Sequence, residues 1–180
     1  ISGVSAGGAM AMQVEFAFSA TVKSVGIIAG IPYLCAYGNL ATAELCLNES
    51  WLIDVDGLLT LAATAADLGN IDPLSNLVNH SALLFSGTKD TVVKHETMIK
   101  LQDMLTKASV SNVTAIFDFP AEHAWITNNN DSTSLKRTND EEIHQCDYLG
   151  LPYINNCGFD FAGAMLQQAF LHVGLEWMNT

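Results

Sequence analysis

Three short segments of the chain are almost continuously apolar, and they restrict the fold more than any other feature. These segments cover residues 25–29, 82–86 and 113–119. Segments with apolar residues at helical spacing, 51–68 and 92–107, lie between them. Strands that lack polar alternation are buried on both faces, and this happens when helices cover both sides of a parallel sheet. The sequence therefore predicts an α/β fold.

The remaining segments extend this pattern to both ends of the chain. Residues 1–4 are typical of the end of a strand, and residues 6–19 have the small and apolar side chains of a buried helix. Asn48 or Ser50 is available to cap the helix over 51–68, and a short helical piece follows Pro73. Residues 128–142 are polar and indicate a loop, and residues 159–177 predict a last helix. No repeat or domain boundary interrupts the chain, so residues 1–180 are interpreted as a single domain.

The charge balance excludes several classes of partner. The 180 residues include 19 acidic and 7 basic side chains, for a net charge of −12. Phosphate binding needs a concentrated basic surface, so we expect neither a nucleic acid nor an anionic membrane surface as a partner. No run of about 18 apolar residues occurs, and we therefore predict no transmembrane helix.

Four cysteines fall into two pairs, Cys35 with Cys46 and Cys146 with Cys157. Neither pair has the C-x-x-C spacing of zinc or thioredoxin chemistry, and two short-range disulfides are the simplest pairing. Disulfides require an oxidising compartment, and four N-glycosylation motifs point the same way, at Asn48, Asn79, Asn112 and Asn130. We therefore expect an extracellular protein. The alternative is four reduced cysteines buried as small apolar residues, with motifs that occur by chance.

The first residues carry the strongest indication of chemistry. Gly3-Val4-Ser5-Ala6-Gly7 is a G-x-S-x-G motif between a strand and a helix, the context of a nucleophile elbow. We expect glycine at positions 3 and 7 because a Cβ would clash in so tight a turn, and Gly8 to let the helix approach the sheet. Ser5 is then the nucleophile, and the backbone N–H of Ala6 is the donor to the oxyanion. The alternative is an ordinary strand-to-helix turn.

A serine nucleophile needs a histidine base and an orienting carboxylate, in the chain order Ser, Asp, His. Asp90 and His123 each follow a predicted strand, at the carboxyl edge of the sheet where active sites of open α/β folds lie. Asp118 is the main rival acid, but it belongs to the strand that delivers His123. Glu122 adjoins the histidine, and for its side chain we expect a surface role.

Four other histidines are less well placed as the base. His95 falls within a predicted helix, and His144 falls in the polar loop. His172 lies on the apolar last helix, and His80 precedes a strand and so lies at the opposite edge of the sheet.

Six segments together resemble the catalytic domain of poly(3-hydroxybutyrate) depolymerases, which are secreted α/β-hydrolases. The segments are ISGVSAGGAMAMQ, IIAGIPYLCA, GNIDPLSNL, LLFSGTKDTVV, PAEHAWITN and PYINNCGFDFAGAML. The resemblance implies that Ser5 is the nucleophile, Asp90 the orienting acid and His123 the base, the residues that the strand positions also favour. It also implies a disulfide loop over residues 146–157 before the last helix.

One part of the family's pattern is missing. Members of this family carry a His-Gly motif that supplies a second oxyanion donor, on a block of strands either before the serine or after the last helix. No histidine in this chain is followed by glycine. We therefore expect only the second half of the α/β-hydrolase sheet, about four strands of about eight, with an exposed sheet edge. The missing part of its own chain is a possible partner.

The substrate is less strongly indicated. Tyr33, Trp51 and Trp125 are candidates to line an apolar cleft for a polyester, although aromatic residues beside a buried sheet more often belong to the core. A feruloyl or acetylxylan ester is the alternative substrate class, and a non-catalytic fragment that binds polymer or a partner is the alternative to an enzyme. Nothing in the sequence suggests a metal ion or an organic cofactor.

Overall fold

Four parallel strands form the central sheet, in the order in which they occur along the chain. The protein is represented by a computed structural model, which describes residues 1–128 and 143–172. The strands are β1 (Ser2–Val4), β2 (Ser24–Ile28), β3 (Ser81–Phe85) and β4 (Asn112–Ile116). Val4 lies beside Ile28, Ile28 beside Phe85, and Phe85 beside Ile116. The carboxyl ends of all four strands therefore meet at one edge of the sheet.

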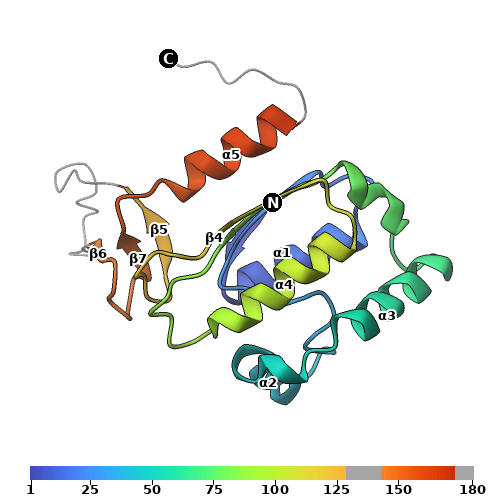
Figure 1. Cartoon of the computed structure of the whole chain (residues 1–180), viewed down its shortest axis with the longest axis horizontal. Coiled ribbons are helices and arrows are strands. Elements are labelled where there is room, and N and C mark those ends of the chain that lie inside the picture. The colour runs from blue at the N-terminus through green and yellow to red at the C-terminus, as the bar shows by residue number, and fades with distance from the viewer. Residues whose placement is uncertain (129–142, 173–180) are drawn as a thin grey trace.

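Helices cover both faces of this sheet, as the apolar strands predict. Figure 1 shows α1 (Ala6–Ala17) and α4 (His95–Lys107) on one face and α5 (Phe161–His172) on the other. Successive residues of β3 point to opposite faces: Leu84 belongs to one buried cluster with Met12 and Leu101, and Phe85 to a second with Phe161. This double burial confirms the predicted α/β architecture.

The region between β2 and β3 differs from its prediction. The helix expected over 51–68 is divided into a 3₁₀ turn, η1 (Ser50–Leu52), and α3 (Val55–Asp67). The N-cap of α3 is Asp54, whose carboxylate accepts the N–H of Gly57, so neither Asn48 nor Ser50 is the cap. Another 3₁₀ helix, η2 (Leu74–Asn79), follows.

Helix α2 (Leu40–Asn48) was not predicted. Its N-cap is Asn39, whose side-chain oxygen accepts the N–H groups of Ala41 and Thr42. The disulfide Cys35–Cys46 joins this helix to the segment that follows β2. Asn39 was the sequence signal for the helix, because asparagine is a preferred N-cap residue.

A second, smaller sheet lies beyond one end of the central sheet (Figure 1). It contains β5 (Trp125–Thr127), β7 (Ile154–Asn156) and β6 (His144–Gln145), in that order. The disulfide Cys146–Cys157 closes the loop that links β6 to the end of β7. Both predicted cysteine pairings are thus confirmed, and the described residues contain no free cysteine. These strands are too short for sequence periodicity to indicate them.

Several boundaries are also shifted. β4 ends at Ile116 rather than at residue 119, and α4 begins at His95 rather than at residue 92. The last helix extends over Phe161–His172 in the described part, and most of the predicted polar loop, residues 129–142, lies outside it. No helix among the described residues has the length and apolar character needed to cross a membrane.

A buried polar pair holds α1 to the edge of the sheet opposite the carboxyl ends of the strands. Glu15 on α1 and His80, directly before β3, are 1% and 0% exposed. Nδ1 of His80 lies 2.6 Å from Oε1 of Glu15, and Nε2 lies 3.0 Å from the carbonyl oxygen of Ser19. This placement confirms the expectation that His80 lies away from the carboxyl edge.

We predict that Glu15→Ala or His80→Ala lowers the free energy of unfolding by about 3–5 kcal/mol, because each leaves its partner buried and unpaired. Urea unfolding followed by circular dichroism measures this change. The double variant Glu15→Met/His80→Leu is the control, because it removes both polar groups together and should lose less stability than either single variant. Single variants within about 1 kcal/mol of the original chain would contradict the prediction.

Candidate active site

Ser5 occupies the whole turn between β1 and α1. β1 ends at Val4 and α1 begins at Ala6, so one residue reverses the chain. Its backbone has φ 57° and ψ −123°, a region that a residue with a side chain rarely adopts. The N–H of Ser5 donates to the carbonyl of Ile28 at the end of β2, and its carbonyl accepts from Ala9. The sheet and the helix together therefore hold this strained conformation.

Two of the three glycines around Ser5 make this turn possible. A Cβ on Gly3 would lie 2.2 Å from the backbone carbon of Gly7, and one on Gly8 would lie 3.0 Å from the carbonyl oxygen of Ile28. The expected clash at Gly7 is wrong: a Cβ there would meet nothing within 4 Å. Gly7 points away from the sheet on the first turn of α1, whereas Gly3 and Gly8 lie at the contacts between strand, helix and sheet.

Asp90 and His123 are in direct contact. Nδ1 of His123 lies 2.9 Å from Oδ2 of Asp90, and the side chains are 8% and 2% exposed. A carboxylate only accepts hydrogen bonds, so Nδ1 carries the proton and Nε2 is left as an acceptor. Oδ1 of Asp90 accepts the N–H groups of Val92 and Val93 at 2.9 and 2.8 Å. Both oxygens are thus occupied, and the carboxylate has a fixed orientation.

The loops after β3 and β4 bring these side chains together. Strands in a sheet are about 4.8 Å apart, so β4 lies about 14 Å from β1. Residues 117–122 can span up to about 20 Å, which lets the loop after β4 return along the edge of the sheet. Its carbonyl groups at Phe119 and Ala121 accept the N–H groups of Thr88 and Lys89 in the loop after β3. These bonds place His123 against Asp90.

In the described part of the chain, Ser5 has the fewest side-chain hydrogen bonds of the three candidate residues. It is half-buried, and its Oγ makes no hydrogen bond within residues 1–128 and 143–172. The structure thus joins Asp90 to His123 but does not join His123 to Ser5. Catalytic hydrogen bonds are often long in proteins without bound substrate and shorten when the substrate binds. Ala6 is exposed and starts α1, where backbone N–H groups lack helical acceptors.

The rival acid and the other histidines have different surroundings. Asp118 is exposed, and the carboxylate in contact with His123 is that of Asp90. Nδ1 of His95 lies 3.2 Å from Oγ of Ser86, and Nε2 of His144 lies 2.7 Å from the carbonyl oxygen of Leu151. The side chain of His172 lies outside the described residues.

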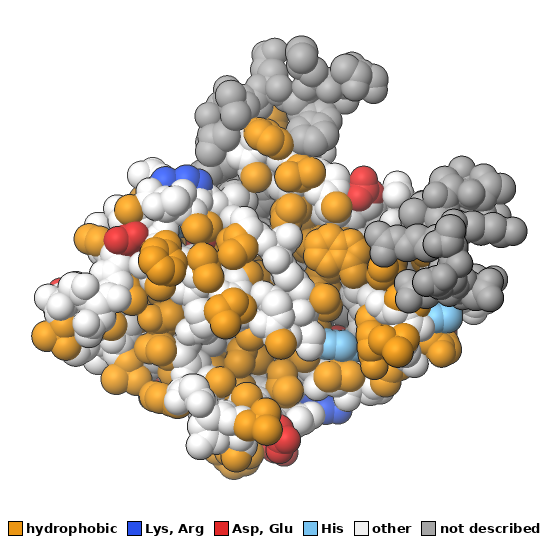
Figure 2. Space-filling model, turned by 180° about the vertical axis from the view of Figure 1, so that it is seen from behind, with side chains coloured by type: hydrophobic (Ala, Val, Ile, Leu, Met, Phe, Trp, Pro, Cys, Tyr) orange, Lys and Arg blue, Asp and Glu red, His pale blue; other side chains and the backbone are white. Residues whose placement is uncertain are grey.

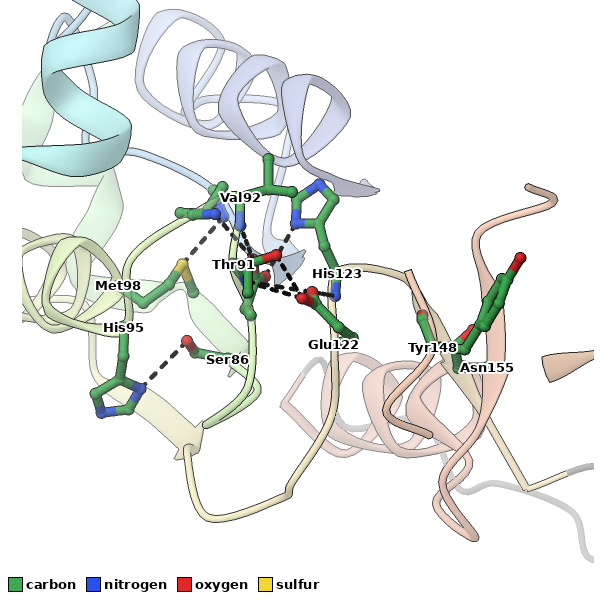
Figure 3. Close-up of polar contacts among 12 residues, drawn as sticks. Ser86, Thr91, Val92, His95, Met98, Glu122, His123, Tyr148 and Asn155 are labelled. Carbon is green, nitrogen blue, oxygen red and sulfur yellow. Dashed lines mark hydrogen bonds and ion pairs between the residues drawn. The ribbon is translucent and has the colours of Figure 1, made fainter. Parts of the chain in front are cut away.

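The expected surface role of Glu122 is wrong. Glu122 is only 8% exposed, because its carboxylate is turned into the space between the loops that carry Asp90 and His123. Figure 3 shows this carboxylate between Thr91 and His123. Sequence reasoning missed it, because the direction of a side chain in an irregular loop depends on the neighbouring loop.

The aromatic residues considered for substrate binding are in unlike places. Tyr33 is 5% exposed in the core, and its ring stacks on Phe16 at 4.6 Å between ring centres. Burial raises the pKa of its phenol. Trp125 is half-buried and meets Phe161 edge to face, whereas Trp51 is 75% exposed. The position of Tyr33 matches the core alternative.

An exposed ion pair lies next to the candidate acid. Lys89, next to Asp90, forms an exposed ion pair with Asp147, and its hydrogen bond lowers the pKa of that carboxyl group. Figure 2 shows a face on which apolar side chains are widespread and charged ones are few. Within the described part of the chain, no group of three or more histidine, cysteine, aspartate or glutamate side chains is arranged to hold a metal ion.

Comparison with characterised proteins identifies two similar sequences, although no protein-family model matches the chain. A poly(3-hydroxybutyrate) depolymerase of Delftia acidovorans is 39% identical over 173 residues, which cover 94% of this chain and 33% of the relative. A polyhydroxybutyrate depolymerase of Talaromyces funiculosus is 30% identical, over the whole of this chain and 49% of the relative. The chain thus spans between a third and a half of the length of these relatives.

Two solved structures are similar to this one, each with a TM-score of 0.78 over 94% of this chain and 50% of the other. One is a PHB depolymerase from Penicillium funiculosum, 28% identical. The other, 27% identical, is a serine-to-alanine variant of a PHB depolymerase complexed with an R3HB trimer. These matches confirm the resemblance to poly(3-hydroxybutyrate) depolymerases and an α/β-hydrolase type of fold, and this chain covers 50% of the length of each solved structure.

The glycines around Ser5 provide a matched pair of variants. We predict that Gly3→Ala destabilises the chain by about 1–3 kcal/mol, because the new Cβ must displace the backbone at Gly7. Gly7→Ala adds the same methyl group in open space on a helix and should change stability by less than about 1 kcal/mol. Thermal unfolding followed by circular dichroism compares the two. Equal stability of both variants would show that the turn tolerates a side chain at position 3.

Proposed function

We propose that the protein containing this chain is a secreted serine esterase that hydrolyses poly(3-hydroxybutyrate) or related short hydroxyacyl esters. The observation that carries this proposal is the contact of Asp90 with His123 at the same sheet edge as the Ser5 turn. The similarity to depolymerases supports the substrate class. We assign residues 1–180 to one α/β-hydrolase catalytic domain, of which this chain is a part.

The proposed reaction proceeds through an acyl-enzyme. His123 Nε2 accepts the proton of Ser5 Oγ as the oxygen attacks the ester carbonyl. Asp90 keeps Nδ1 protonated and stabilises the imidazolium that forms. The backbone N–H of Ala6 donates to the oxyanion, at the positive end of the α1 dipole. His123 then gives its proton to the leaving alcohol, and a water molecule, deprotonated by the same nitrogen, hydrolyses the acyl-enzyme.

The disulfides support the proposed extracellular location. Cys35–Cys46 and Cys146–Cys157 require an oxidising compartment to form and persist. The asparagines of three N-glycosylation motifs, Asn48, Asn79 and Asn112, are exposed, and the fourth, Asn130, lies outside the described residues. A polyester is uncharged, and the acidic surface of the chain is compatible with it.

We predict that Ser5→Ala abolishes covalent labelling of the chain by a fluorophosphonate probe, because the probe forms its bond with an activated serine oxygen. Labelling is detected by gel fluorescence and mass spectrometry, with Ser2→Ala as the control. Equal labelling of Ser5→Ala and the original chain would sink the nucleophile assignment. An absence of labelling in every form would favour a non-catalytic protein that binds polymer or a partner.

Hydrolysis of p-nitrophenyl butyrate tests the acid and the completeness of the site. We predict a rate for the 180-residue chain about 10²–10³ below that of a complete depolymerase, because one oxyanion donor is not among its residues.

Asp90→Asn should lower the remaining rate by up to about 10⁴, because the wrong nitrogen of His123 is then protonated. A high rate for the chain would contradict the first prediction, and an unchanged rate in Asp90→Asn the second. Preference for feruloyl or acetylxylan esters would identify the alternative substrate class.

A further inference from the structure

Glu122 has a buried carboxylate for which the proposed reaction gives no role. A buried charge is costly unless it is hydrogen-bonded, so its partners indicate what it does. Both oxygens accept the backbone N–H of Thr91 at 3.2 Å. Oε1 also accepts the Thr91 hydroxyl, and Oε2 accepts the backbone N–H of His123, each at 2.5 Å. Four contacts from three donors therefore surround this carboxylate.

These donors belong to the two loops that the proposed triad must align. Thr91 directly follows Asp90, and His123 directly follows Glu122. One carboxylate therefore holds the backbone beside the acid and the backbone of the base, as Figure 3 shows. The 2.9 Å contact between Asp90 and His123 lies between these two anchored points.

The backbone around Glu122 holds it firmly in place. Its own N–H donates to the carbonyl of Cys146, in the loop closed by the Cys146–Cys157 disulfide. On the other side, a Cβ on Gly87 would lie 2.0 Å from the carbonyl oxygen of Ala121. The loop after β3 that carries Asp90 (the acid loop), the loop after β4 that carries His123 and the loop closed by the disulfide therefore meet at Glu122. This arrangement leaves the carboxylate of Glu122 little freedom to move.

We propose that Glu122 is a positioning residue that holds the loops of Asp90 and His123 together and so maintains the hydrogen bond between them. This inference rests on the proposed function for its catalytic meaning. A carboxylate suits the position because it has about four acceptor sites and no donor. The side chain of glutamine has nearly the same shape, but its NH₂ group would face the N–H groups of Thr91 or His123, donor against donor.

The test compares Glu122→Gln with Glu96→Gln in the 180-residue chain. Glu96 is exposed on the first turn of α4, so its variant makes the same change of charge close to the acid loop. Two readouts are measured well below the unfolding temperature. One is the second-order rate of fluorophosphonate labelling at Ser5, and the other is the low-field NMR signal of the His123 Nδ1 proton.

We expect Glu122→Gln to lower the labelling rate by about 100-fold, since a displacement of about 1 Å can cost that much, and to broaden or remove the His123 signal. Glu96→Gln should leave both readouts unchanged. A lower unfolding temperature with an unchanged labelling rate and signal would give Glu122 a purely structural role and overturn the proposal.

Two further measurements keep the proposal testable if Glu122→Gln does not fold. Thr91→Val removes one donor at an exposed position and should produce the same changes to a smaller degree; no change in either readout would overturn the proposal. If the original chain is not labelled at all, the proposed function fails. The His123 signal then still tests the role of Glu122, because it must be present in the original chain and weakened in Thr91→Val.

Discussion

Parallel pairing of β1, β2, β3 and β4 is the constraint on which the rest of the structure depends. It directs four carboxyl ends to one edge, so that residues 5, 90 and 123 leave the sheet on the same side. Reversal of β1, β3 or β4 would move one of these three residues to the opposite edge of the sheet. The apolar composition of the strands follows from the same arrangement, because helices bury both faces.

The turn at Ser5 and the contact of Asp90 with His123 are stabilised in different ways. Ser5 has a strained backbone, held by a hydrogen bond to β2 and by the close approach of α1 to β1 at Gly3. Asp90 and His123 lie on irregular loops, where no helix or sheet determines the geometry. Backbone hydrogen bonds between the loops, the carboxylate of Glu122 and the nearby Cys146–Cys157 disulfide replace that regular support.

Local sequence patterns were sufficient to predict the main strands, α1, α4 and both disulfides, because runs of apolar residues and the spacing of cysteines can be recognised in the sequence. They were insufficient where tertiary contacts decide the outcome. Asp54 rather than Ser50 caps α3, because the chain first makes the separate turn η1. Gly7 resembles Gly3 in the motif, but only Gly3 faces another backbone segment.

The sequence by itself determined the alternation of buried strands with helices, the serine turn and the identity of the candidate acid and base. These depend on residue type and on position along the chain. Only the tertiary structure decided that Asp90 contacts His123, that Tyr33 lies in the core and that the charge of Glu122 is buried. Contacts between loops set these features, because the direction of a loop side chain depends on which other segment packs against it.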